Sequence, residues 1–112
     1  MRIIKQNNRV DTNSYYELMH IKSVPNKVLY KTFVNWVSGE FELFLQDKLN
    51  GLKIFFPSGY FSITESETNN TDVNFKIIVR SKSKQKGIQI STQINAVLNH
   101  LLKLKYNSYQ RI

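Results

Sequence analysis

The sequence VNFKIIVRSKSKQK, residues 73–86, carries the clearest structural pattern in the chain. In its first half the apolar side chains fall mainly on odd positions, which is the two-residue period of a half-buried β-strand. We therefore predict a strand over 73–81. In its second half every even position is a cation, so a chain that stays extended would carry a row of positive charge on one face. These cations are Arg80, Lys82, Lys84 and Lys86.

Two further strands are predicted immediately before this one. Leu52–Phe56 and Tyr60–Ser66 flank Pro57-Ser58-Gly59, a turn in which proline restricts φ and glycine supplies conformational freedom. The polar residues 66–72 then lead into the strand over 73–81. A hairpin centred near Asn69 would bring these strands into antiparallel register with apolar side chains on one buried side. That register places Ile63 opposite Phe75 and Phe61 opposite Ile77.

The N-terminal part of the chain favours helices. Residues 1–12 have the composition of a polar arm. Asn13 or Ser14 can cap a short helix over 15–21, although a segment this short also fits a strand.

Residues 27–49 carry a stronger helical signal. Polar side chains recur every three or four residues from Lys27, and apolar ones follow the opposite face until Asn50-Gly51, a suitable helix stop. Ser38-Gly39 allows either a kink or a second helix that Ser38 would cap. A β-hairpin competes, because residues 28–37 are rich in β-branched and aromatic side chains. Of one helix, two helices or a hairpin, we favour the helical interpretation.

A last helix is predicted after the cation-rich stretch. Ile88 and Ile90 fit a continued strand, and Ser91 or Thr92 then caps a helix that runs to about Tyr106. Its apolar face consists of Ile94, Val97, Leu98, Leu101 and Leu104. The predicted fold is therefore α+β, with N-terminal helices, an antiparallel sheet of three to four strands, and a C-terminal helix packed on one face.

Length and composition fit a single domain over residues 1–112. The chain is 41% hydrophobic with four glycines and two prolines, which is typical of a packed globule and not of a disordered segment. It has no cysteine, so disulfides and thiolate chemistry are excluded. Apolar runs are shorter than a signal-peptide core or a membrane span, so we expect a cytoplasmic protein without a membrane partner.

The net charge of +8 is unevenly distributed. Residues 1–37 hold six cations and two acids, residues 38–72 hold two cations and six acids, and residues 73–112 hold eight cations and no acid. A segment without a carboxylate cannot neutralise its own charge. Its cations must therefore face the acidic middle of the chain, solvent or an anionic partner.

The cations after residue 73 form the candidate site. Cations about 7 Å apart along a strand roughly match the spacing of phosphates along a nucleic-acid strand, and tyrosines near the C-terminal cations can stack on bases. The competing interpretation is a solubilising edge, since lysine on an exposed strand prevents edge-to-edge pairing. The predicted nucleic-acid-binding residues are Lys76, Arg80, Lys82, Lys84, Lys86, Lys103, Lys105, Tyr106, Tyr109 and Arg111.

No sequence motif indicates catalysis, a metal or a cofactor. Glu17 and His20 have the Glu-x-x-His spacing of a di-iron bundle, but the sequence holds no second copy. A helix-turn-helix drawn over residues 25–50 would place an acidic helix against the phosphates of the major groove, which is unfavourable. We therefore expect a binding protein, not an enzyme, with no metal and no cofactor.

The leading hypothesis is a small basic protein that contacts the phosphate backbone of nucleic acid. The alternative is an inhibitor or adaptor that binds a host protein, or a homodimer formed through exposed aromatic residues. In an extended strand, Tyr15-Tyr16, Phe55-Phe56 and Tyr60-Phe61 would each place one ring on each face. Abundant Lys, Asn and Ile with a single alanine are typical of AT-rich genomes, and the small size suits accessory proteins of phages and mobile elements.

Overall fold

The computed structural model describes residues 14–66 and 72–110, with side chains described as far as Lys105. The predicted arm over 1–12 lies outside these ranges. The elements in chain order are β1 (Tyr16–Val24), α1 (Lys27–Glu40), β2 (Leu45–Asp47), β3 (Leu52–Phe56), β4 (Gly59–Glu65), β5 (Val73–Ser81) and α2 (Lys84–Gln110). The α+β prediction is confirmed, with an N-terminal strand and one helix in place of the expected N-terminal helices.

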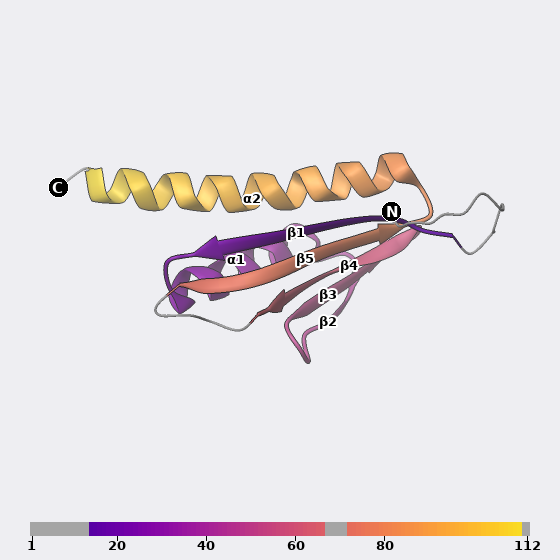
Figure 1. Ribbon diagram of the computed structural model, residues 1–112, viewed down its shortest axis with the longest axis horizontal. Helices are drawn as coiled ribbons and strands as arrows, with labels where there is room; N and C mark the ends of the chain where they lie inside the picture. The colour runs from indigo at the N-terminus through magenta and orange to yellow at the C-terminus, as the bar shows by residue number, and fades with distance from the viewer. Residues whose placement is uncertain (1–13, 67–71, 111–112) are drawn as a thin grey trace.

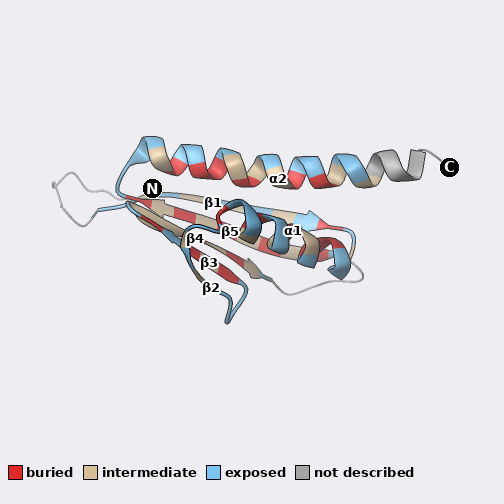
Figure 2. Cartoon of the chain, turned by 180° about the vertical axis from the view of Figure 1, so that it is seen from behind, coloured by how far each residue is buried: buried red, intermediate tan, exposed pale blue. Residues whose placement is uncertain are grey.

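The strands form one antiparallel sheet of five strands in the order β1-β5-β4-β3-β2 (Figure 1), one more than the largest number expected. α1 contacts β1 and β3, α2 contacts β1 and β5, and the two helices contact each other. Both helices thus pack on one face of the sheet, the covered face (Figure 2). The opposite face, which no helix of the described chain covers, is the open face. It carries Asn74, Lys76, Ile78 and Arg80 together with the residues paired with them in the neighbouring strands.

β5 confirms the strand predicted over 73–81. Its odd residues are all buried and its even residues are half-buried, because helices cover only one side of the sheet. Phe75 contacts two rings of α1, those of Tyr30 and Phe33, each with its ring centroid 5.3 Å away. The apolar pattern of this strand therefore marks the centre of the core.

β1 occupies the segment for which a helix was the first prediction. It pairs with β5 residue for residue over nine positions. The helix over 15–21 is therefore wrong and the strand alternative is correct. A helix of two turns is marginal on its own, whereas a neighbouring strand of equal length supplies a hydrogen-bond ladder. The covered face receives Tyr16, Leu18, His20, Lys22 and Val24, and the open face receives Glu17, Met19, Ile21 and Ser23.

α1 forms the first part of the predicted helical region and ends at Glu40. Asn26 is its N-cap, because the side-chain oxygen accepts a hydrogen bond from the backbone N–H of Leu29 at 2.9 Å. None of the three alternatives for residues 27–49 describes the segment after α1, since Leu45–Asp47 forms β2.

Gln46 of β2 explains why the helix does not continue. Its side-chain amide donates hydrogen bonds to the carbonyl oxygens of Ser38 and Phe41, at 2.9 and 3.0 Å. These bonds satisfy backbone acceptors at the end of α1 that a continuing helix would otherwise use. Ser38 is thus part of a helix end and caps no second helix, and the second helix of the helix-turn-helix is not formed.

β3 and β4 confirm the predicted hairpin, but its turn consists of Pro57 and Ser58 alone, because Gly59 is the first residue of β4 and pairs with Phe56. A Cβ atom at Gly59 would lie 1.9 Å from the carbonyl oxygen of Arg80, so glycine is needed where β4 meets β5. The register of that pair differs from the prediction by two residues: Ile63 lies opposite Ile77, and Phe61 lies opposite Val79. A shift of two keeps every side chain on its face, so the apolar pattern alone could not detect it.

α2 begins at Lys84, earlier than predicted. Ser83 takes the capping role, since its Oγ accepts a hydrogen bond from the backbone N–H of Lys86 at 3.1 Å. The expected strand over 88–90 is wrong, because those residues lie inside this helix. The buried stripe consists of Ile90, Ile94, Leu98 and Leu101, with Val97 half-buried.

The C-terminal turns of α2 extend past the end of the sheet (Figure 1). Leu104, predicted to belong to the apolar face, is 47% exposed there. Within residues 14–66 and 72–110, neither helix is long and apolar enough to cross a membrane.

Candidate nucleic-acid interface

The predicted row of cations does not exist, because β5 ends at Ser81. Arg80 is the last residue of β5 on the open face, Lys82 lies in the turn between β5 and α2, and Lys84 and Lys86 lie in the first turn of α2. The chain reverses direction between the second and third of these cations, so their shared parity no longer places them on one face.

Three of these cations instead gather around two adjacent tyrosines. The guanidinium carbon of Arg80 lies 4.9 Å from the ring centroid of Tyr15, and Lys82 Nζ lies 5.8 Å from the same centroid. Lys84 Nζ lies 5.7 Å from the ring centroid of Tyr16. We call this group, together with the neighbouring Lys86 in the first turn of α2, the β5–α2 corner. It comprises Tyr15, Tyr16, Arg80, Lys82, Lys84 and Lys86.

The backbone of the corner is held by serines. Ser81 is fully buried, and its Oγ accepts a hydrogen bond from the backbone N–H of Ser83 at 3.0 Å. The same Oγ lies 2.9 Å from Ser58 Oγ in the turn between β3 and β4. Lys82 N donates to the Ser58 carbonyl oxygen at 2.8 Å. These bonds join the turn between β3 and β4 to the turn between β5 and α2. The backbone that carries the exposed Lys82 and Lys84 is therefore held in place.

Arg80 connects the corner to the open face. Its Nη1 donates a hydrogen bond to Tyr60 Oη at 3.5 Å, and its Nε lies 3.2 Å from Glu17 Oε1. The bond to Tyr60 raises the pKa of Arg80, the Glu17 carboxylate adds to this effect, and partial burial opposes it. The guanidinium therefore stays charged at any physiological pH.

The open face carries aromatic rings beside cations. Cross-strand pairing places Arg80, Tyr60 and Phe55 in one row across β5, β4 and β3. The rings of Tyr60 and Phe55 are 6.2 Å apart between centroids and are inclined by 51°. Lys53 Nζ, from the next row, lies 4.3 Å from the Tyr60 centroid and 5.3 Å from that of Phe55.

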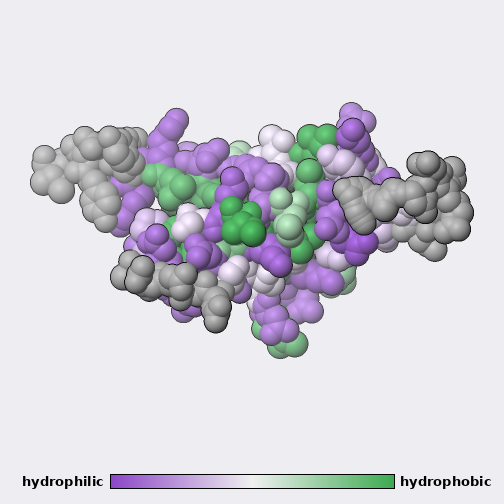
Figure 3. Space-filling view, viewed as in Figure 1, coloured by the Kyte–Doolittle hydropathy of each residue, from purple (hydrophilic) through white to green (hydrophobic). Residues whose placement is uncertain are grey.

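Figure 3 views the sheet from the side opposite α1 and shows apolar side chains near the middle of this face, with hydrophilic ones around them. The second row carries Met19, Ile78, Ser62, Lys53 and Asp47, and the third carries Ile21, Lys76 and Thr64. Met19 and Ile21 are 54% and 67% exposed, so the centre of the face is partly apolar.

The remaining predicted site residues are not part of the corner. Lys76 lies on the open face four residues before Arg80, about 13 Å along the strand. Lys103 is exposed on α2 and lies about 28 Å along the helix axis from Lys84, with half-buried Lys105 beyond it. The side chains of Tyr106 and Tyr109, and the whole of Arg111, lie outside the described residues.

Aromatic residues of the site were partly foreseeable. Phe56 and Phe61 are buried while Phe55 and Tyr60 lie on the open face, which confirms the split expected for these two pairs. The roles of Glu17 and Lys53 were missed, because both depend on which strands are neighbours. Nothing in their local sequence points to these contacts.

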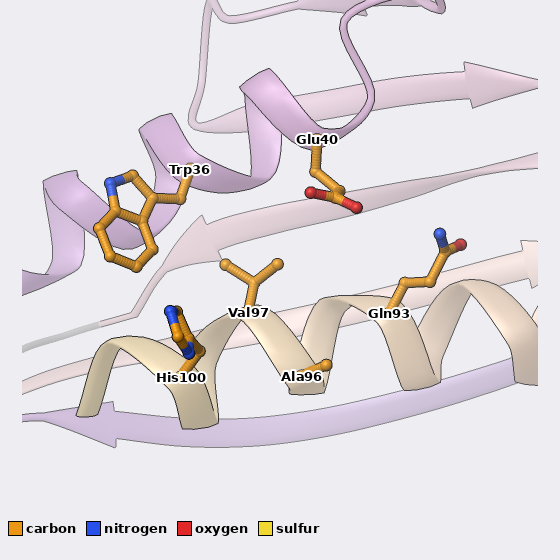
Figure 4. A pocket seen from close by; sticks show the side chains of 6 residues that line it. All are labelled: Trp36, Glu40, Gln93, Ala96, Val97 and His100. Atoms are coloured by element: carbon orange, nitrogen blue, oxygen red, sulfur yellow. The ribbon is translucent and has the colours of Figure 1, made fainter. Parts of the chain in front are cut away.

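An open groove of about 480 Å³ lies between the helices (Figure 4). Trp36 of α1 and His100 of α2 face each other across it with ring centroids 6.1 Å apart. Glu40 and Gln93 lie at the other end, and Ala96 and Val97 lie between. The groove is shallow and carries one acid, so it is a poor place for a phosphate.

Among the described residues, no three or more His, Cys, Asp or Glu side chains lie together in a group that could hold a metal ion. Glu17 and His20 would share a helical face, but in β1 they point to opposite faces of the sheet. His20 Nε2 lies 3.4 Å from Ser91 Oγ of α2, at the boundary of the core.

No protein-family model matches this sequence, and no curated protein matches it. The chemistry of the corner and of the open face therefore rests on the residues themselves.

Proposed function

We propose that this protein is a non-catalytic nucleic-acid-binding protein that contacts the phosphate backbone at the β5–α2 corner. The observation that carries the proposal is that three cations lie against two adjacent tyrosines at one end of the sheet: Arg80 and Lys82 over Tyr15, and Lys84 over Tyr16. Clustered cations on an exposed surface bind phosphates and release counterions, which favours binding to any polyanion.

Charge separation along β5 supports this choice of surface. Glu65 and Asp72 lie towards the opposite end of β5 from Arg80. Asp72 is about 26 Å away along the strand, and Glu65, which pairs with Phe75, is about 17 Å away. Glu65 is also paired with Lys27, whose Nζ is 2.6 Å from Glu65 Oε1. The corner is thus far from these acids, and Glu17 is the one carboxylate in contact with Arg80 among the described residues.

The start of α2 adds to the positive potential. The free backbone N–H groups of a helix N-terminus carry partial positive charge, and α2 begins at Lys84 inside the corner. Lys103 and Lys105 lie about 28 and about 32 Å from this point along the helix axis. They would therefore contact only a ligand that runs along the whole of α2.

A matched pair of variants tests the corner. Lys82→Glu with Lys84→Glu, and Lys31→Glu with Lys48→Glu, each lower the formal net charge from +8 to +4 at exposed positions. Each phosphate contact contributes about 0.9 to the slope of log affinity against log salt on duplex DNA and about 0.7 on single strands. We expect the corner variant to lose about 1.4 to 1.8 from the slope, and the control to keep the wild-type slope.

Two results would contradict the proposal. Equal losses in both variants would mean that overall charge, and not the corner, governs binding. No salt-sensitive binding of wild-type protein to DNA or RNA would exclude nucleic acid as the ligand.

Exposed apolar residues favour a second candidate function, binding to a protein partner. Met19 and Ile21 stand side by side on β1, 54% and 67% exposed, on the same face as Ile78. Exposed apolar side chains that are rimmed by polar ones mark protein interfaces. A homodimer would show a mass above 13.2 kDa in light scattering. A host adaptor or inhibitor would retain a stoichiometric protein partner after nuclease treatment of the lysate.

A further inference from the structure

We infer that the open face stacks the bases of single-stranded DNA or RNA on Tyr60 and Phe55. This inference rests on the proposed function, because the phosphates of the same strand would lie at the β5–α2 corner. It adds the class of ligand, a single strand, which the corner alone does not specify.

A continuous line of contacts joins the corner to these two rings. Tyr15 lies against the guanidinium of Arg80, at 4.9 Å from ring centroid to guanidinium carbon. Arg80 donates to the hydroxyl of Tyr60, and the ring of Tyr60 lies 6.2 Å from that of Phe55. The line crosses β5, β4 and β3 on one face. A strand whose phosphates contact the corner therefore has aromatic rings within reach of its bases.

Tyr60 and Phe55 would favour an unpaired strand, because an aromatic ring can stack only on a base whose face is accessible. In a duplex the bases are stacked on one another and only their edges are accessible in the grooves. In a single strand each base has a face that can stack on an aromatic side chain, and such stacking tolerates any base sequence. The half-buried Tyr60 and the 37% exposed Phe55 are open to solvent on a face that no described helix covers.

Cations beside the rings distinguish this surface from a typical protein-binding patch. Lys53 Nζ lies over both rings in the free protein, at 4.3 Å from the Tyr60 centroid and 5.3 Å from the Phe55 centroid. Its long, flexible side chain can turn towards a phosphate and leave the ring faces to a base. The centre of a protein interface is depleted of charge, whereas aromatic rings among cations are the pattern of single-strand binding surfaces.

Oligonucleotides with and without bases separate stacking from phosphate contact. The probes are a thymidylate strand of about 12 nucleotides and an abasic strand of the same length, which carries the same phosphates. A duplex of the same length is the third probe. Wild-type protein is expected to bind the thymidylate strand at least about 10-fold more tightly than the abasic strand, since each stacking ring contributes about 5- to 150-fold.

Matched variants locate the stacking surface. Phe55→Leu with Tyr60→Leu should bring the ratio of thymidylate to abasic affinity close to one. Phe55→Leu alone keeps the hydrogen bond between Arg80 and Tyr60, so it should lower the ratio and leave abasic binding at the corner unchanged. Ile21→Thr, a change on the same face without a ring, should keep the wild-type ratio. The melting temperature of each variant checks that it is folded. The ratio of thymidylate to abasic affinity in the wild-type protein tests the inference without any variant.

Each other outcome overturns the inference in a recognisable way. Equal binding of thymidylate and abasic strands, or tighter binding of the duplex, removes the stacking surface and leaves the phosphate site at the corner standing. Absence of binding to all three probes removes the proposed function as well. A double ring variant that keeps the wild-type affinity ratio but no longer self-associates assigns this face to a second copy of the chain.

Discussion

Ile77 and Ile78 are neighbours of the same type on β5, yet they lie in different environments. Ile77 is 1% exposed beneath the helices, whereas Ile78 is half-buried on the open face. On the covered face, every residue of β5 from Val73 to Val79 is apolar. On the open face, Ile78 is the one apolar residue of β5, and the others are polar or charged. One strand therefore contributes to the core on one side and to the open face on the other.

The largest expected difference between the two faces is in the free energy of unfolding when Ile77 or Ile78 is replaced by alanine. Ile77→Ala should destabilise the fold by about 2–5 kcal/mol, because it leaves a cavity in a closed core. Ile78→Ala should cost about 1 kcal/mol or less, since water can fill the space. Urea unfolding of both variants measures the difference. Equal losses would mean that a partner or another part of the chain covers the open face.

Ser81 marks the point where the covered face turns polar, and its loss should have an intermediate effect. Ser81→Ala removes the acceptor for the Ser83 N–H and the partner of the Ser58 hydroxyl. A buried group left without its hydrogen bond costs about 1–3 kcal/mol. Ser62→Ala, on the open face of β4, is the control and should change stability by about 0.5 kcal/mol or less. Similar melting temperatures for both variants would show that the corner is held by other contacts.

A smaller effect on stability is expected at Glu17, on the open face. Glu17→Gln removes the carboxylate beside Arg80, and an exposed ion pair contributes about 0–1 kcal/mol. Under the proposed function the same change should tighten binding to nucleic acid, because it removes a negative charge from the edge of the corner. Glu42→Gln, on an exposed residue after α1, should leave the affinity closer to that of the wild type. Weaker binding by Glu17→Gln would contradict the proposed position of the phosphates.

The smallest effect concerns Tyr30 on the covered side and is absent at neutral pH. Burial raises the pKa of Tyr30 above its ordinary value of 10.0, and the charge of Glu65 raises it further. The unfolded chain therefore ionises at a lower pH than the folded chain. The contribution of the neutral Tyr30 side chain to the free energy of unfolding is therefore fully present below about pH 10. It is lost as the pH rises towards the raised pKa. Tyr30→Phe should reduce the steepness of this alkaline loss in pH-dependent melting, and unchanged steepness would show that Tyr30 does not contribute.

Local pattern was sufficient wherever one element had a clear period. The two-residue period of 73–81, the hairpin that joins β3 to β4 and the helical stripe from Ile94 to Leu101 all appear in the structure as predicted. These features depend on side chains a few residues apart, so the physics that forms them is visible in the sequence itself.

The errors lie where partners distant in sequence compete with local preference. The segment over 15–21 is a strand because β5 is available along its whole length, and residues 45–47 join the sheet through β3. The register of β4 on β5 is shifted by two residues, which leaves the apolar pattern unchanged. Local propensity is weak compared with these tertiary contacts.

Residue pattern and composition were enough to predict the α+β class, the strand over 73–81, the faces of its residues and a C-terminal third without a single acid. The place where that charge gathers depends on tertiary contacts. Shared parity predicted a row of four cations, but the chain turns after Ser81 and starts a helix, because Ser81 and Ser83 hold the turn and Gly87 lets α2 approach β1 closely. The pairing of β1 with β5 then brings Tyr15 and Tyr16 to the same corner, since strand neighbours are set by backbone hydrogen bonds between segments far apart in the chain.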